Sequence, residues 1–399
     1  MTEENYRNNY APDENGRSDY NAGRQYSDPR FTYGNNPYYG NSGDAYRNSY
    51  DPYASPYGNP YGRQPKKGIV SRIREYFQKK PYNGIAVFSA FHSIGIILYL
   101  ILSSAIGTFI VIISGLGGNI FEDTGMSVLG MLSSVFCVGL PFIVVWCLMR
   151  RYDKTYFDIP FGKPRKNSHV LLLILAGMGF CYMGNIITGY FTAIFQSFGI
   201  DFASTEAAAA LTDTPDTPMG FVLNLIYVAV LPAFFEEIAF RGVIMQPLRK
   251  YGDWFAIGIS AVIFGLIHGN MTQMPFAICA GIALGYVFIV TGSIWPSVII
   301  HFLNNSLALV CNEMLSRLSV TGAMLFSAVF IYGIIAVGVV AFIAYTKLNK
   351  NYRKLRKGEY TGLRTKRKVN VYFLMPPMLF AVAVLIMNVL SDMVLGGLV

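Results

Sequence analysis

The sequence has few charged residues for its length. Only 14% of its 399 residues are Asp, Glu, Lys or Arg, whereas 53% are hydrophobic. A soluble domain of ordinary composition carries roughly 25% charged residues. This shortage excludes an ordinary soluble globular protein and favours a polytopic membrane protein. The net charge of +9 does not indicate nucleic-acid binding, because the basic residues flank apolar spans, as cytoplasmic loops of membrane proteins do.

Cysteine is also scarce. All five cysteines lie in apolar runs and none forms a CxxC pair, which favours small core residues over disulfides or a metal knuckle. The first residues are polar, so no secretory signal peptide is predicted. The first apolar span is therefore expected to be an uncleaved anchor.

The N-terminal region has almost no aliphatic residues. Residues 1–65 are rich in Tyr, Asn, Gly and Pro, which predicts a disordered cytoplasmic tail. Residues 66–82 include the basic stretch KKGIVSRIREYFQKK, which predicts a juxtamembrane helix on an anionic leaflet or the positive flank of the first span. Residues 83–399 are expected to form an all-α transmembrane helical bundle.

Nine apolar runs come close to the about 20 residues that span a bilayer. They are 89–116, 126–149, 170–198, 221–245, 254–269, 274–290, 295–315, 323–345 and 371–395. The fifth and sixth are short and could be one re-entrant feature, so the prediction is eight or nine spans. Pro376 and Pro377 are expected to kink the last span or end it early. The loops alternate between basic and non-basic, which predicts a cytoplasmic N-terminus.

The stretch LPAFFEEIAFRG (231–242) places two acids and an arginine inside an apolar run. A charge at the bilayer centre costs roughly 2.5–3.5 kcal/mol on an insertion scale, so these residues should pair, line a wet cavity or do chemistry. Arg241 lies four residues after Glu237 on the same helical face and can neutralise it. Glu236 is rotated by about 100° and has no partner in its own segment, which suits a general base. The alternative is a packing salt bridge with one spare acid.

Two of the four histidines lie in the apolar runs that follow. His268 ends FGLIH, with Phe264 one turn before it, and His301 begins HFLNN, with Asn305 one turn after it. Counted from the basic ends of their spans, these polar side chains and Glu236 lie at depths of about 12–21 Å. They can meet in one layer if the three helices are neighbours.

The residue types allow two chemistries. A Glu, two His and an Asn could deprotonate a water and hold a tetrahedral oxyanion. No Ser or Cys nucleophile stands at a recognisable elbow, which favours direct attack by water on a peptide bond. Glu236, His268 and His301 could instead hold a zinc ion with water as the fourth ligand, although the spacing is not HExxH. Zinc is therefore the candidate cofactor, and neither chemistry is excluded.

Three segments resemble the motifs EExxxR, FxxxH and HxxxN. They are EEIAFR (236–241), FGLIH (264–268) and HFLNN (301–305). In this order and inside apolar spans, they are similar to the type II CAAX prenyl endopeptidase family, also called the CPBP or Abi family of intramembrane proteases. The resemblance covers about residues 221–312.

The resemblance implies an α-helical membrane endopeptidase with its site inside the bilayer. Glu236 would activate water, and His268 would assist it. His301 and Asn305 would form the oxyanion site. The supporting residues would be Glu237, Arg241 and Phe264.

The family also suggests partners and a location. It implies contact with membrane lipid and a peptide or protein substrate, prenylated or with an apolar tail. Bacterial relatives process peptides or are linked to bacteriocin self-immunity, and the compact spans favour a multi-pass protein of a bacterial plasma membrane. Two other functions stay open, because intramembrane acids and histidines also form proton relays. They are a transporter or proton-coupled channel, and a catalytically silent membrane scaffold.

Overall fold

The computed structural model is helical throughout the residues that it describes. These are 83–115, 123–152, 158–166, 168–200, 217–350, 355–358 and 363–396. The predicted tail (1–65) and basic juxtamembrane segment (66–82) lie outside them. Seven helices are long and apolar enough to cross a membrane, and the count is eight if a bent pair of helices forms one span. The predicted all-α membrane bundle is therefore confirmed, with seven or eight candidate spans in this part of the chain against the eight or nine predicted.

The first three spans are long helices, and the second contains one π-helical turn. They are α2 (Asn83–Gly115), the unit α3 (Asp123–Ser133), η2 (Ser134–Gly139) and α4 (Leu140–Tyr152), and α5 (Val170–Ser197). Their sequences are almost wholly apolar, as the hydrocarbon core of a bilayer requires. A helix also satisfies every backbone hydrogen bond within the span. These bounds lie close to the runs read from the sequence.

The fourth span is irregular, and it carries the acid pair. Its segments are α7 (Pro218–Leu225), η3 (Ile226–Val230), α8 (Leu231–Glu237), η4 (Ile238–Met245), α9 (Gln246–Leu248) and η5 (Arg249–Tyr251). Both η3 and η4 are π-helical, a geometry that is rare and often found at functional sites. Thr217 caps the start of α7 by accepting a hydrogen bond from the backbone N–H of Gly220.

The fifth and sixth runs form a helical hairpin. They are α10 (Asp253–Ile267) and α11 (Met274–Thr291). With its 15 residues, α10 is about 22 Å long, shorter than the roughly 30 Å hydrocarbon core. Asn270 holds the turn between them, because its side-chain oxygen accepts hydrogen bonds from the hydroxyl of Thr272 and the backbone N–H of Gln273. The C-terminal end of α10 therefore lies inside the bundle.

The last third of the chain contains α12 (Trp295–Leu315), α13 (Val320–Leu348), α14 (Thr365–Phe373) and α15 (Pro376–Gly396). Pro296 stands in the first turn of α12, where a missing N–H costs nothing. The last predicted span, 371–395, is broken, because α14 and α15 meet at an angle of 82°. The break falls just before Pro376 and Pro377, which confirms the predicted kink.

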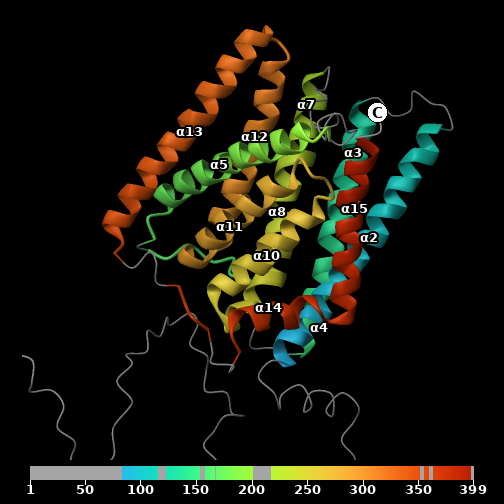
Figure 1. Cartoon of the computed structure of the whole chain (residues 1–399), viewed down its shortest axis with the longest axis vertical. Helices are drawn as coiled ribbons and strands as arrows, with labels where there is room; N and C mark the ends of the chain where they lie inside the picture. The colour runs from blue at the N-terminus through green and yellow to red at the C-terminus, as the bar shows by residue number, and fades with distance from the viewer. Residues whose placement is uncertain are drawn as a thin grey trace, which may run out of the picture. The chain divides into compact units, whose positions relative to one another are not determined.

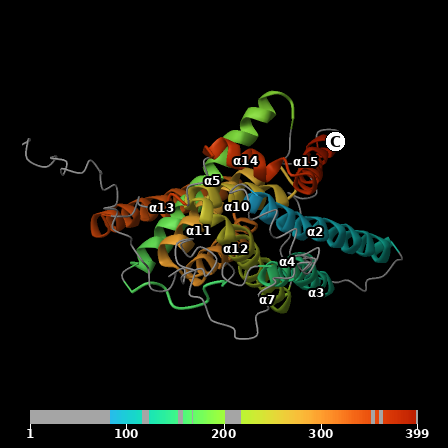
Figure 2. The ribbon, with the colours of Figure 1, turned by 90° about the horizontal axis from the view of Figure 1, so that it is seen from below.

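Helices α5, α10, α11 and α12 pack together at the centre, with α13 and α2 toward opposite sides (Figures 1 and 2). Helix α5 lies against both α11 and α13. It crosses α13 where a Cβ on Gly179 would stand only 2.7 Å from the Cα of Gly338. Paired glycines let two membrane helices approach this closely. On the other side, α2 packs against α4 and α15.

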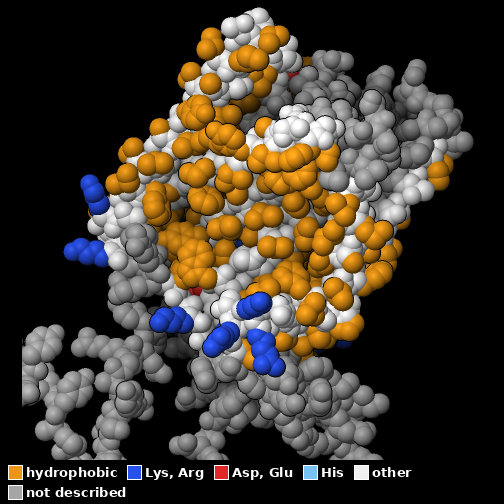
Figure 3. All heavy atoms as spheres, in the orientation of Figure 1, with side chains coloured by type: hydrophobic (Ala, Val, Ile, Leu, Met, Phe, Trp, Pro, Cys, Tyr) orange, Lys and Arg blue, Asp and Glu red, His pale blue; other side chains and the backbone are white. Residues whose placement is uncertain are grey.

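Basic side chains gather at one end of the helices, below a broad apolar surface (Figure 3). Short backbone contacts join the loops at this end. The N–H of Arg165 donates to the carbonyl of Thr291, and the N–H of Asp253 donates to the carbonyl of Arg356. We refer to this as the basic end. Among the described basic residues, Arg241 is buried in the fourth span and Arg317 lies at the start of the α12–α13 connection, away from this end.

Candidate active site

The two adjacent acids occupy different environments. Oε1 of Glu237 lies 2.8 Å from Nη1 of Arg241, four residues later on η4. The two side chains are only 0% and 1% exposed, so the predicted ion pair is present and fully buried. The same Oε1 lies 2.9 Å from Nδ1 of His301 on α12. Glu237 therefore joins the fourth span to α12.

Glu236 lies on the other side of this contact. Its side chain is 18% exposed, and its Oε2 is 3.8 Å from Nε2 of His301. That separation is too long for a hydrogen bond. Within the described residues this buried oxygen has no hydrogen-bond partner. One imidazole thus contacts Glu237 through one nitrogen and faces Glu236 through the other.

The ring of Phe264 on α10 is the common neighbour of the three motifs. It packs edge-on against His268 at 4.9 Å and against His301 at 5.9 Å between ring centroids. The guanidinium carbon of Arg241 lies 4.8 Å from the centre of the same ring. A cation over an aromatic face is stabilised by the ring quadrupole, which matters for an arginine whose Nε and Nη2 have no hydrogen-bond partner in the described residues.

His268 is held in one tautomer by its own helix. Its Nδ1 lies 2.7 Å from the carbonyl oxygen of Phe264, and a carbonyl can only accept a hydrogen bond. Nδ1 therefore carries the proton, and Nε2 of the neutral ring is left with its lone pair. Tyr99 of α2, which the motifs do not include, donates a hydrogen bond to the carbonyl of Ile267 and so anchors the end of α10. No sequence pattern distinguishes Tyr99 from other aromatic residues of the spans.

Asn305 is fixed by contacts with the fourth span. Its Nδ2 donates to the carbonyl of Val228 over 2.9 Å, and its Oδ1 accepts from Nδ2 of Asn304 over 3.2 Å. Pro232, four residues after Val228, has no N–H to give to that carbonyl. Asn305 thus supplies a donor where proline removes one. No motif singled out Asn304, although its place beside Asn305 in HFLNN could have indicated it.

The residues predicted for zinc do not form a cage of ligands. Within the described residues, no three His, Cys, Asp or Glu side chains are grouped so that they could hold a metal ion. Nδ1 of His268 and Nδ1 of His301 are bonded elsewhere, which leaves Glu236 and the two Nε2 atoms as candidate ligands. As the structure places them, these three groups do not come together as the ligands of one ion.

Comparisons with known proteins identify a family domain around these residues. Residues 218–307 match the family described as type II CAAX prenyl endopeptidase Rce1-like. The chain therefore carries a domain of this family over residues 218–307. The Rce1-like domain runs from α7 into α12 and contains all seven residues singled out in the sequence.

One curated relative is the Bacillus subtilis (strain 168) protein named "Putative membrane peptidase YdiL". It is 27% identical over 135 residues, which cover 31% of this chain and 54% of the relative. The match thus spans about half the length of that relative. No solved structure matches this chain significantly.

Proposed function

We propose that this protein is an intramembrane endopeptidase in which Glu236 activates the attacking water. The unequal use of the two acids carries the proposal. Each acid has an Oε2 without a hydrogen-bond partner among the described residues. Glu237 is fully buried, and its Oε1 pairs with Arg241 and His301. Glu236 has no such ion pair and is 18% exposed. The 3.8 Å between Glu236 and Nε2 of His301 suits a water that bonds to both.

The proposed reaction needs only protein groups and water. The carboxylate of Glu236 takes a proton from the water as its oxygen attacks the carbonyl carbon of the peptide. The carbonyl π electrons move onto oxygen, and nearby N–H donors stabilise this oxyanion. The C–N bond then breaks, and the proton held by Glu236 passes to the leaving nitrogen. The products are a carboxylic acid and an amine.

Two groups suit the oxyanion. Asn305 has a second amide N–H beyond the one given to Val228. Nε2 of His301 becomes a donor when the ring is protonated, because Nδ1 is held by Glu237. Glu237 and Arg241 would keep this imidazole in place without touching the substrate. The observed contacts are consistent with the roles that the family motifs suggest.

The surroundings favour a substrate with an apolar tail. Glu236 stands in the middle of a membrane-crossing helix whose sequence is mostly apolar. The family description and the name of the Bacillus relative both point to peptide substrates at a membrane. We infer that the natural substrate presents its scissile bond next to a hydrophobic or prenylated segment.

The test is cleavage of a library of apolar-tailed peptides by purified protein in detergent. We expect Glu236→Gln to lower the rate by about 10²–10⁴-fold, the usual contribution of a general base, while thermal unfolding stays unchanged. Glu313→Gln is the matched control, because this acid pairs with Arg317 at the exposed end of α12.

Three outcomes would count against the mechanism. Equal activity of Glu236→Gln and wild type would refute the role of Glu236. Loss of wild-type cleavage with a chelator would replace glutamate-activated water with zinc. Ion flux in proteoliposomes that depends on Glu236, without any cleavage, would favour a transporter.

A further inference from the structure

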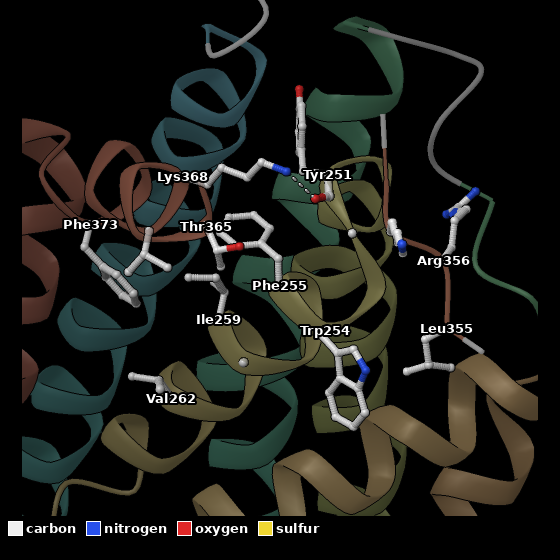
Figure 4. Close-up of a pocket in the computed structure, with 14 residues that line it drawn as sticks. Tyr251, Trp254, Phe255, Ile259, Val262, Leu355, Arg356, Thr365, Lys368 and Phe373 are labelled. Carbon is white, nitrogen blue, oxygen red and sulfur yellow. Dashed lines mark hydrogen bonds between the residues drawn. The ribbon is translucent and has the colours of Figure 1, made fainter. Parts of the chain in front are cut away.

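A cavity lies at the basic end, away from the candidate active site. It has a volume of about 450 Å³ and lies between the start of α10, the segment 355–358 and α14 (Figure 4). None of the seven site residues lines it. Its basic wall contains Arg356, Lys357 and Lys368. The apolar wall is formed by Phe255, Ile259, Val262, Val369 and Phe373.

Lys368 is a buried cation with one hydrogen-bond partner. It is 8% exposed, and its Nζ donates to the carbonyl of Tyr251 over 2.8 Å (Figure 4). An ammonium has three N–H groups, so two are left over. No carboxylate in the described part of the chain forms an ion pair with it. Burying a cation without an anion is costly, so this side chain indicates an anionic ligand.

Among the described residues, the acid beside the cavity is Asp253, and it is already paired. Oδ1 of Asp253 accepts from Nε of Arg249 over 2.9 Å, and its Oδ2 accepts from the backbone N–H of Arg356 over 2.9 Å. The guanidinium of Arg356 approaches the same carboxylate to 3.9 Å. Together with Lys357 and Lys368, the cations around the cavity outnumber this single carboxylate. Within the described part of the chain, the side chains of the basic wall therefore carry more positive than negative charge.

The apolar side of the cavity follows an exposed face of α10. Most of α10 is buried, but Trp254, Gly258 and Val262 are exposed and recur every four residues. A Cβ on Gly258 would have no atom within 4 Å, so the surface is open there. Trp254 is 58% exposed, as is usual for tryptophan where a membrane meets water. This exposed face therefore offers an apolar surface to a hydrocarbon chain.

We propose that the cavity binds an anionic phospholipid. Its phosphate would contact Lys368, Lys357 and Arg356. The part of one acyl chain nearest the headgroup would lie along Gly258 and Val262. A free phosphate would account for the basic wall but not for the apolar face that continues from it. The position also suits a lipid, because α14 turns 82° from α15 at the basic end of the helices (Figure 1).

Binding is tested by titrating detergent-solubilised protein with dioleoyl phosphatidylglycerol or dioleoyl phosphatidylcholine and counting bound lipids by native mass spectrometry. The wild type should prefer phosphatidylglycerol. Lys368→Gln should weaken this binding by about five-fold, the effect of one basic residue near an anionic headgroup. Lys366→Gln is the control, because Lys366 is exposed on the same helix and does not line the cavity. Lys357→Gln, at an exposed position, is a second test if Lys368→Gln does not fold.

The acyl chain is tested separately with Gly258→Leu, which fills the open face of α10. It should weaken phosphatidylglycerol binding, whereas Gly333→Leu, at an equally open position on α13, should not. If Lys366→Gln and Lys368→Gln weakened phosphatidylglycerol binding equally, the effect would come from general surface charge, and the proposal would be overturned. Equal binding of the two lipids would do the same. Displacement of the lipid by inorganic phosphate, with no effect of Gly258→Leu, would show an anion site without a lipid chain.

Discussion

At the scale of single residues, the site depends on a difference between neighbours in sequence. Glu236 and Glu237 point about 100° apart on the helix, so one meets Arg241 and the other does not. Glu237 uses its charge to hold His301 and Arg241 in place. Glu236 keeps an oxygen without a hydrogen-bond partner in the described residues. One acid can therefore be structural while the other remains free for chemistry.

The buried ion pair leads to a prediction about stability. Arg241→Met removes the cation and leaves Glu237 fully buried with His301 alone. Removing one partner of a buried ion pair typically costs about 3–5 kcal/mol, so the free energy of unfolding should fall by that amount. Unfolding of the purified variant in detergent measures the loss. The double variant Glu237→Gln/Arg241→Met leaves no unpaired charge and should be destabilised less than Arg241→Met.

The chain contains a matched control for this prediction. Glu313 in the last turn of α12 and Arg317 just after the helix form the same i,i+4 pair, but the arginine side chain is 76% exposed. Arg317→Met should change the free energy of unfolding by about 0–1 kcal/mol. Similar losses for Arg317→Met and Arg241→Met would mean that burial of the inner pair does not determine its contribution.

At the scale of elements, the fourth span is shaped by its proline and by its neighbour α12. Pro232 stands between two π-helical stretches, η3 and η4, and withholds an N–H from the carbonyl of Val228. Asn305 of α12 donates to that carbonyl instead. The helix that carries the acids is thus bonded sideways to the helix that carries His301. These contacts fix the position of the EExxxR motif of the fourth span relative to the HxxxN motif of α12.

The contact of Asn305 with Val228 can be tested by restoring the missing donor. Asn305→Asp keeps the shape of the side chain but removes its N–H, which should lower the free energy of unfolding by about 1–3 kcal/mol. In Pro232→Ala/Asn305→Asp the new backbone N–H can bond to Val228, so part of that loss should be recovered. Unfolding in detergent measures both variants. A double variant no more stable than Asn305→Asp would refute the role assigned to Pro232.

The spans and motifs could be predicted because each is local in sequence. Apolar runs mark the helices, and the i,i+4 spacing alone predicts the pair of Glu237 and Arg241. The contact of Asn305 with Val228 could not be predicted, because it depends on which helices are neighbours. The π-helical geometry and the 82° angle between α14 and α15 also depend on tertiary packing. Pro376 indicated where the last span bends but not by how much.

At the scale of the whole molecule, basic side chains are concentrated at one end of the helices. The described lysines and arginines gather at the basic end, apart from the buried Arg241 and the distant Arg317 (Figure 3). The loops that flank cytoplasmic ends of spans are enriched in lysine and arginine. We therefore propose that the basic end faces the cytoplasm. The proposed lipid cavity would then meet the leaflet whose surface is usually anionic.

This orientation predicts opposite accessibility for two cysteine substitutions. In a variant without the five native cysteines, Lys357→Cys should react with a membrane-impermeant maleimide only from the cytoplasmic side. Arg317→Cys should react only from the other side, because Arg317 begins the connection between α12 and α13. Labelling of intact cells and of inverted vesicles, read by mass shift, measures both. Reaction of both cysteines from one side would contradict the proposed topology. The reverse pattern would place the basic end, and the lipid cavity with it, outside.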